Sequence, residues 1–201
     1  MIFNKSLKYD FMPDLRTDEN LDPIEVVKEM KLLGVTLSSD LNWHQHVSNI
    51  CKKAYLSLWM LRRLKKLGAT SDMLLDLYAK HVRCNLEYAT PAWNPGLTQS
   101  DVIDLERVQK CALSVIFSEK SYTKKLKMSK LDTLADRREK ICKKFALKTS
   151  KNNRFEHWFV KKNPARNTRQ KTDNFTVPPS RCKRYENSPF PYLTRILNTV
   201  A

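Results

Sequence analysis

One stretch, residues 40–66, constrains the fold more than any other part of the chain. Apolar residues recur in it at spacings of three and four, which is the pattern of one buried face of an α-helix. This stripe consists of Val47, Ile50, Cys51, Ala54, Leu58, Leu61 and Leu64. Asp40 or Asn42 can cap the start, and Gly68 lies just past the end, where a left-handed residue can close a helix. The sequence therefore predicts one long helix that packs its apolar stripe against a core.

The other side of this helix is basic. It carries Lys52, Lys53, Arg62, Arg63, Lys65 and Lys66. Such charges on a single helix often form only a solvated face. The bias extends to the whole chain, because 37 lysine and arginine residues outnumber 21 acidic residues and give a formal net charge of +16. This balance favours a polyanionic partner, either nucleic acid or an anionic membrane surface. The membrane ranks last, because the basic helices leave no broad apolar face free for lipid once a core has formed.

Further helical patterns follow at residues 71–87, 100–117 and 129–150. Before the long helix, short apolar runs around Val26 and Val35 predict a β-hairpin with its turn at residues 28–31. Another strand can form at residues 5–12, ahead of a polar loop. Two or three strands do not make a stable sheet alone, so we expect the hairpin to be the edge of something larger.

These patterns predict a mainly α fold in three parts. Residues 1–39 form the β edge, residues 40–150 a bundle of about four helices, and residues 151–201 a basic, partly irregular tail. Within the tail, residues 163–184 are rich in Asn, Pro, Arg and Lys, a composition that resists packing. Residues 189–200 carry aromatic and aliphatic side chains that can dock as a short helix.

One pattern suggests a metal-dependent nuclease. Asp14, Glu29 and Lys31 match the PD…ExK spacing in which two carboxylates hold Mg²⁺ and a lysine supports the attacking water. The pattern is short, and the chain turns helical soon after Lys31, where the nuclease fold needs a central sheet. Polymerases also need clustered acids to bind two metals, and no Asp-Asp pair occurs in this chain. We therefore expect no catalytic residues and no metal cofactor.

Histidines and cysteines give no better metal site. His44 and His46, with Cys51 or Cys84, offer the right atoms for zinc, but a His-x-His pair on a helix points its side chains about 200° apart. Five cysteines without a CxxC spacing favour reduced thiols rather than a disulfide framework. The sequence also lacks a signal-peptide pattern and a membrane-spanning apolar run, so we expect a nuclear or cytoplasmic protein.

Several ordered motifs resemble one family. They are residues 31–47 (KLLGVTLSSDLNWHQHV), 77–78 (LY), 82–83 (VR), 86–89 (LEYA), 91–93 (PAW), 105–110 (LERVQK), Leu131, Leu134, 137–138 (RR), Phe145, 184–185 (RY) and 191–193 (PYL). Together they resemble the region after the catalytic palm in reverse transcriptases of non-LTR retrotransposons, the jockey-like group and its relatives. The resemblance covers nearly the whole chain.

The resemblance implies that residues 1–39 match the last palm strands and that residues 40–150 match the thumb. The aspartate triad that binds Mg²⁺ in the intact polymerase would lie before residue 1, so this chain would not polymerise by itself. The hairpin centred on Lys31 to Val35 matches the primer grip, where Gly34 would let the backbone approach nucleic acid and Lys31 could contact a phosphate.

The thumb of such an enzyme follows an RNA–DNA template–primer through its backbone. The first residues assigned to this contact are the six cations of the long helix, Lys52, Lys53, Arg62, Arg63, Lys65 and Lys66. A second set is Arg137, Arg138, Lys143 and Lys144, for which a solvated face is an equal alternative. By the same resemblance, Trp93 and Tyr88 are expected to anchor a connection in the core.

Two other hypotheses remain open at this point. The chain could be a helical interaction module derived from a retrotransposon, with Leu33, Val35 and Trp43 in an exposed patch that binds a missing palm, fingers or another protein. It could also be an inert remnant.

Overall fold

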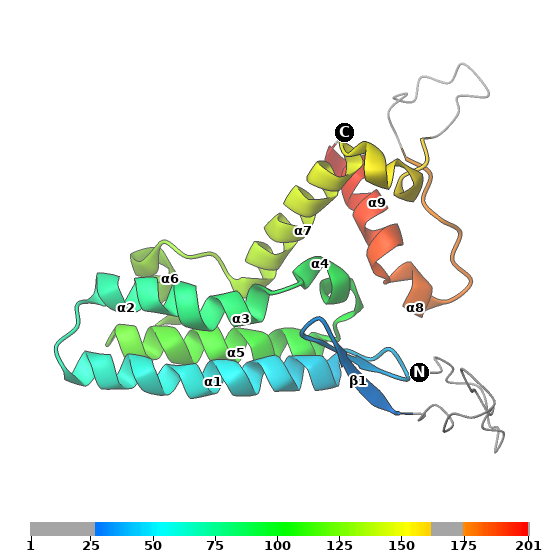
Figure 1. Cartoon of the computed structure of the whole chain (residues 1–201). Coiled ribbons are helices and arrows are strands. Elements are labelled where there is room, and N and C mark those ends of the chain that lie inside the picture. The colour runs from blue at the N-terminus through cyan, green and yellow to red at the C-terminus, as the bar shows by residue number, and fades with distance from the viewer. Residues whose placement is uncertain (1–26, 162–174, 201) are drawn as a thin grey trace.

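The computed structural model describes residues 27–161 and 175–200. The predicted mainly α fold is confirmed: a two-stranded hairpin precedes a series of helices (Figure 1). The elements are β1 (Glu29–Leu32), β2 (Val35–Ser38), α1 (His44–Lys66), α2 (Ser71–Leu77), η1 (Tyr78–Arg83), α3 (Cys84–Glu87), α4 (Thr90–Trp93), η2 (Asn94–Gly96), α5 (Gln99–Ile116), α6 (Tyr122–Ser129), α7 (Leu134–Ser150), η3 (Asn153–Trp158), α8 (Lys183–Glu186) and α9 (Pro189–Val200).

A three-rod bundle forms the main body. α1 and α5 lie side by side, and the continuous rod of α2, η1 and α3 packs against them (Figure 1). The predicted apolar stripe of α1 faces this core, where Ala54, Leu58 and Leu61 are fully buried. Burying one leucine completely is worth roughly 1.5–3 kcal/mol relative to leaving it exposed, so this stripe accounts for much of the bundle's stability.

The C-terminal end of α1 is closed as the sequence predicts, but the N-cap differs. The N-cap residue is Trp43, whose side chain makes no capping bond, and Oδ1 of Asn42, one residue earlier, accepts the backbone N–H of His44 at 3.0 Å. Gly68 has φ +87°, and the N–H groups of Gly68 and Ala69 donate to the carbonyls of Lys65 and Leu64. This pair of bonds is a Schellman motif, which needs a left-handed residue at that position.

A second, smaller core joins α7 to the end of the chain. α7 leaves the bundle at an angle, and α9 packs against the C-terminal half of α7 (Figure 1). Cys142 and Ala146 of α7 are buried against Leu193 and Leu197 of α9, with Phe159 beside them. The prediction that residues 189–200 dock as a helix is therefore confirmed.

The predicted hairpin exists, but the predicted turn was wrong. Its two-residue turn is Leu33–Gly34 rather than residues 28–31, and Leu32 pairs with Val35. Both turn residues have positive φ, 47° and 85°, as in a type I′ turn. The apolar run after Lys31 hid this turn, because leucine seldom adopts positive φ.

The connections between helices also differ from the predicted pattern. The middle of the second rod is a π-helix, η1, and the stiff segment at residues 89–96 contains the short helices α4 and η2. The fourth helix starts later than predicted, at Leu134 rather than residue 129, and an unpredicted helix, α6, precedes it and ends at the left-handed Lys130. Phe145, one of the motif residues of the family resemblance, is exposed on α7.

Several expectations fall wholly or partly outside the described residues. These are the strand at residues 5–12, the loop that follows it, Asp14, and most of residues 163–184. Where that last segment is described, residues 175–182 have no helix or strand apart from one bridge between Lys161 and Phe175. Across the described residues, no helix has both the length and the apolar composition needed to cross a bilayer.

Candidate nucleic-acid interface

The outer face of α1 gathers the first predicted set of cations. Burial of the stripe around Ala54 and Leu58 turns the opposite side of the helix outward, and all six lysine and arginine residues are exposed there or at its flanks. The 23 residues of α1 include no Asp or Glu. Within the described residues, none of the six cations forms a salt bridge. Their charge is therefore available to an anionic partner.

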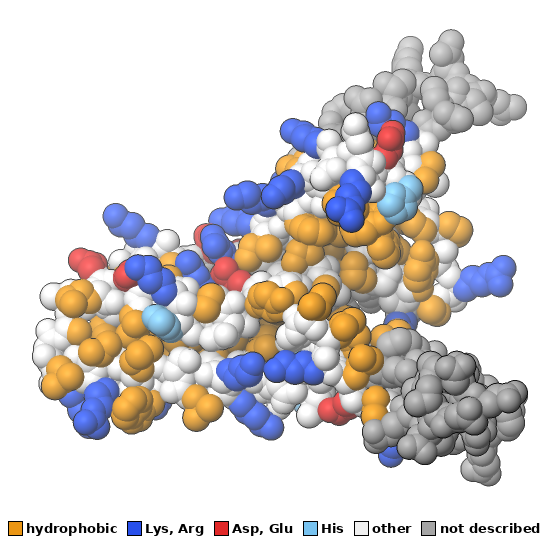
Figure 2. Space-filling view, viewed as in Figure 1, with side chains coloured by type: hydrophobic (Ala, Val, Ile, Leu, Met, Phe, Trp, Pro, Cys, Tyr) orange, Lys and Arg blue, Asp and Glu red, His pale blue; other side chains and the backbone are white. Residues whose placement is uncertain are grey.

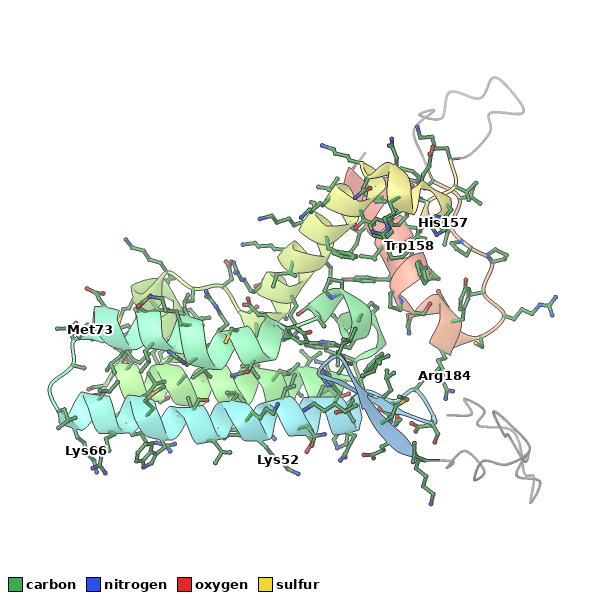
Figure 3. All side chains as sticks on the ribbon, in the orientation of Figure 1. Lys52, Lys66, Met73, His157, Trp158 and Arg184 are labelled. Carbon is green, nitrogen blue, oxygen red and sulfur yellow. The ribbon has the colours of Figure 1, made fainter. Side chains whose placement is uncertain are left out.

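Figure 2 shows cationic and apolar side chains mixed along the surface of α1, at the lower edge of the view. In Figure 3, Lys52 and Lys66 both project away from the bundle on this side. They are 14 residues apart, about 21 Å along the axis at 1.5 Å per residue, so the basic face follows most of the helix.

An open groove of about 760 Å³ lies at the C-terminal end of α1. Trp59, Arg62, Arg63, Lys65, Lys66, Leu67 and Val115 line it. Lys65 also fastens the two helices beneath the groove, because its ammonium group donates to the carbonyl oxygens of Val115 at 2.5 Å and Ile116 at 3.3 Å. A cation at the C-terminus of α5 satisfies carbonyls that have no partner within the helix. Lys65 is thus an anchor as well as a charge in the groove.

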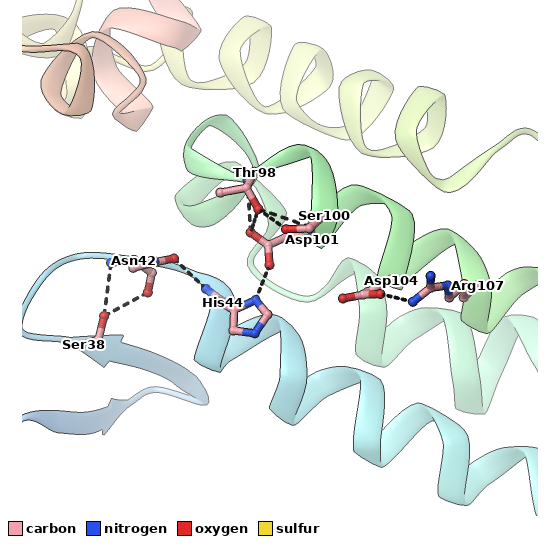
Figure 4. A network of polar contacts seen from close by, with 8 residues as sticks. All are labelled: Ser38, Asn42, His44, Thr98, Ser100, Asp101, Asp104 and Arg107. Atoms are coloured by element: carbon pink, nitrogen blue, oxygen red, sulfur yellow. Dashed lines mark hydrogen bonds and ion pairs between the residues drawn. The ribbon is translucent and has the colours of Figure 1, made fainter.

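A polar network fixes the N-terminal end of α1 against α5 (Figure 4). The Asp101 carboxylate accepts a hydrogen bond from the Thr98 hydroxyl at 2.6 Å and lies 2.9 Å from Nδ1 of His44. Thr98 and Asp101 also form a capping box at the start of α5. Burial acts to raise the pKa of the Asp101 carboxyl, but the bonds to Thr98 and His44 outweigh it and lower that pKa. The carboxylate therefore stays ionised and holds His44.

His46 points to the other side of α1 and ties the hairpin to the bundle. Its Nδ1 accepts the backbone N–H of Thr36 at 3.2 Å, and its ring lies edge-on to Trp43 and Trp93. Nε2 is buried without a partner among the described groups. Burial, with a smaller effect from Lys53, lowers the pKa of the His46 imidazole. His46 is therefore a neutral structural residue.

Both primer-grip candidates, Lys31 on β1 and Gly34 in the turn, are exposed, and one side of Gly34 lies against Tyr88. A Cβ atom placed on Gly34 would lie 3.2 Å from Cε1 of Tyr88. The Tyr88 hydroxyl donates to the carbonyl oxygen of Leu33 at 2.9 Å. The close approach that Gly34 permits is to Tyr88. Tyr88 itself is exposed, which corrects the expectation of a core anchor, whereas Trp93 is fully buried as predicted.

The second predicted set does not form one surface. Arg138 is only 1% exposed and donates from Nε to Oδ1 of Asn94 at 2.9 Å, so its assignment to nucleic acid was wrong. The sequence alone places an arginine at the surface by default, which is why its burial was missed. Arg137 pairs with Glu87 at 3.1 Å. Lys143 and Lys144 are exposed on α7, and the cations of α7 follow a different edge of the molecule from those of α1 (Figure 2).

The metal candidates are not assembled in the described part of the chain. No group of three His, Cys, Asp or Glu residues suited to a metal ion occurs among the described residues. His44 and His46 have the separate partners described above. Of the nuclease pattern, Glu29 and Lys31 lie on β1, an exposed strand of a two-stranded sheet, and Asp14 lies outside the described residues.

The sequence reasoning missed the aromatic and aliphatic part of the interface. Leu56 and Trp59 lie on the outer face of α1 and are 76% and 61% exposed. A signal for them exists: Lys52, Leu56, Trp59, Arg63 and Lys66 recur at spacings of four and three, as the buried stripe does. The outer face is thus a second ordered stripe, mixed in character.

Comparisons of the chain with protein-family models, curated proteins and solved structures gave no match. The family resemblance and the functions it implies therefore stay predictions, and the interface is argued from geometry and charge.

Proposed function

We propose that the chain binds the backbone of a nucleic-acid duplex, an RNA–DNA hybrid in the first instance, through the outer face of α1. One observation carries this function: six exposed cations on one helix, free of acidic residues in that helix and of salt bridges within the described residues. Lysine and arginine side chains neutralise phosphates and release the counterions condensed on them, and this term dominates binding that does not depend on sequence. A straight, rigid helix suits a regular row of phosphates.

The family resemblance adds the biological setting to this proposal. In a reverse transcriptase, a thumb-like region would hold the template–primer, while an aspartate triad elsewhere would bind Mg²⁺ and do the chemistry. This chain would bind the template–primer but would not carry the catalytic aspartates, so the proposed activity is binding and not polymerisation. Phosphate contacts of this kind position a duplex and read no sequence.

The proposal is tested by measuring the affinity of the purified chain for a blunt RNA–DNA hybrid at several salt concentrations. We expect dissociation constants in the micromolar range or tighter at low salt, and affinity that falls steeply as salt rises. A folded chain that fails to bind the hybrid at low salt contradicts the proposal.

A protein-binding function is the second candidate, and one observation favours it. Leu32 and Leu33 of the hairpin are exposed, Leu33 to 84%, while β1 has no strand on its outer side among the described residues. Such an edge can pair with a strand of another protein. Val35 and Trp43, also expected in this patch, are half-buried. A complex formed this way would depend weakly on salt, which distinguishes it from the first candidate.

A further inference from the structure

The outer stripe of α1 contains more apolar surface than phosphate binding requires. At its centre lies Trp59, which is 61% exposed on the side of the helix that faces away from the core. A phosphate group does not stack on an indole ring, whereas every nucleobase has a flat aromatic face that can stack on the indole. The position of Trp59 among cations therefore needs its own explanation.

Charge surrounds this tryptophan within one groove. Arg62, Arg63 and Lys66 line the groove with Trp59, and the described lining residues include no carboxylate. The guanidinium carbon of Arg63 lies 5.6 Å from the centre of the indole ring. An arginine next to an aromatic ring supports stacking, because its planar guanidinium can stack on a base as well.

The length of the groove limits its occupant. Trp59 and Lys66 are seven residues apart, about 10.5 Å along the axis, which corresponds to about three stacked nucleotides at 3.4 Å each. Inside a duplex the faces of the bases are stacked on one another and cannot reach Trp59. Unpaired nucleotides can offer a base to the indole and phosphates to the arginines at the same time.

We propose that the groove at the C-terminal end of α1 binds a short unpaired stretch of nucleic acid, with a base stacked on Trp59 and phosphates held by Arg62, Arg63 and Lys66. This inference rests on the proposed function and names its substrate more closely: a duplex with a single-stranded overhang. A blunt duplex contacts the whole basic face through its phosphates, and in a duplex with an overhang the unpaired stretch occupies the groove.

The test compares a blunt RNA–DNA hybrid with the same hybrid carrying a three-nucleotide overhang, for the full chain and two variants, Trp59→Phe and Trp59→Leu. Phenylalanine keeps a stacking ring, while leucine keeps apolar surface without one. The exposure of Trp59 makes both variants compatible with folding, and circular dichroism checks that they fold. Stacking of one base predicts that the overhang raises the affinity of the wild-type chain about five- to a hundredfold. The Trp59→Phe variant should keep most of this gain and Trp59→Leu should lose it. The gain is the ratio of overhang affinity to blunt affinity measured for each variant, so a change in blunt-hybrid binding does not enter it.

Tryptophan fluorescence gives an independent readout. The chain has four tryptophans: Trp93 is buried, and neither Trp43 nor Trp158 lines the groove. Quenching by a base stacked in the groove should therefore come from Trp59 and disappear in Trp59→Phe. Blunt binding without an overhang preference, or a preference that survives in Trp59→Leu, overturns this inference and leaves the proposed function standing. Failure to bind either hybrid overturns both. Salt-insensitive binding of a protein by this face, lost in Trp59→Leu, also overturns the inference.

Discussion

Burial decides what each arginine of α7 does. Arg137 is partly exposed and shares Glu87 with Arg83, whereas Arg138 is buried and bonded to Asn94. Burial lowers the pKa of the Arg138 guanidinium, with nearby Glu106 acting in the opposite direction, but an arginine stays protonated at neutral pH. The two adjacent arginines therefore have different roles: Arg137 forms a surface ion pair, and Arg138 is part of the buried structure.

Replacing each arginine in turn should therefore change the free energy of unfolding by different amounts. We expect Arg138→Ala to lower the free energy of unfolding by about 2–4 kcal/mol, because it leaves a cavity and an unpaired amide of Asn94. The matched variant Arg137→Ala should cost at most about 1 kcal/mol, since it removes one partly exposed ion pair. Urea unfolding measures both, and equal losses would contradict the assigned roles.

His46 makes stability depend on pH in a defined direction. Its pKa in the folded protein lies below the ordinary value of 6.5, so the unfolded chain binds the proton more readily. The neutral His46 imidazole therefore contributes fully to the free energy of unfolding above pH 6.5, and this contribution is lost as the pH falls below that value. We expect the free energy of unfolding to decrease between pH 7.5 and pH 5.5, where the carboxylates stay ionised.

The variant His46→Gln should remove this pH dependence while keeping an acceptor for the N–H of Thr36. The exposed His81 supplies the control, because His81→Gln should behave as the wild-type chain does. Urea unfolding at the two pH values is the measurement. An undiminished pH effect in His46→Gln would refute the assignment.

At the scale of elements, the hairpin depends on two residues of positive φ. Leu33 adopts φ 47° and is almost fully exposed, so it gains little packing in return for an unfavourable conformation. We expect Leu33→Asn to stabilise the hairpin by about 0.5–1 kcal/mol, since Asn-Gly is the favoured pair in a type I′ turn. Gly34→Ala should destabilise it by about 1–2 kcal/mol, because alanine would be strained at φ +85° and crowd Tyr88.

Hydrogen exchange of the hairpin amides measures these changes locally. The N–H of Ser39 is a suitable probe, because it donates to the carbonyl of Lys28 at 2.8 Å across the open end of the hairpin. Slower exchange in Leu33→Asn and faster exchange in Gly34→Ala are expected. The opposite order would contradict the turn geometry.

Periodicity explains which elements could be predicted. α1 and α5 each repeat apolar residues every three or four positions, and Gly68 after α1 and Thr98 before α5 are residue types that commonly end and begin helices. α6 and the π-helix η1 could not be predicted, because a short helix and an extra residue per turn leave no distinct period. The turn at Leu33 could not be predicted either, because leucine is an unusual residue at positive φ.

The candidate site was predicted in part for similar reasons. Charge counts identified the cations of α1, because exposed lysine and arginine residues are the common case. They failed for Arg138, which is buried and bonded to Asn94 from a distant segment. Tertiary contacts of this kind leave no mark in the local sequence.

At the scale of the whole molecule, positive charge occurs on two separate edges. α1 presents cations and Trp59 on a rigid rod of the main core, while α7 presents Lys143, Lys144 and Lys148 on an arm with a smaller core. A net charge of +16 attracts any polyanion, so binding alone does not locate the interface. The central claim is that the α1 face makes the phosphate contacts.

The most direct test removes three positive charges from each edge in turn. One variant combines Arg62→Ala, Arg63→Ala and Lys66→Ala, leaving the anchor Lys65 in place. The other combines Lys143→Ala, Lys144→Ala and Lys148→Ala and has the same net charge.

The slope of log affinity against log salt is measured on duplex DNA for both variants and the wild-type chain. We predict that the α1 variant flattens the slope by as much as about 2.7, at about 0.9 for each phosphate contact, while the α7 variant stays close to wild type. Equal flattening in both variants, or flattening in the α7 variant alone, would contradict the claim.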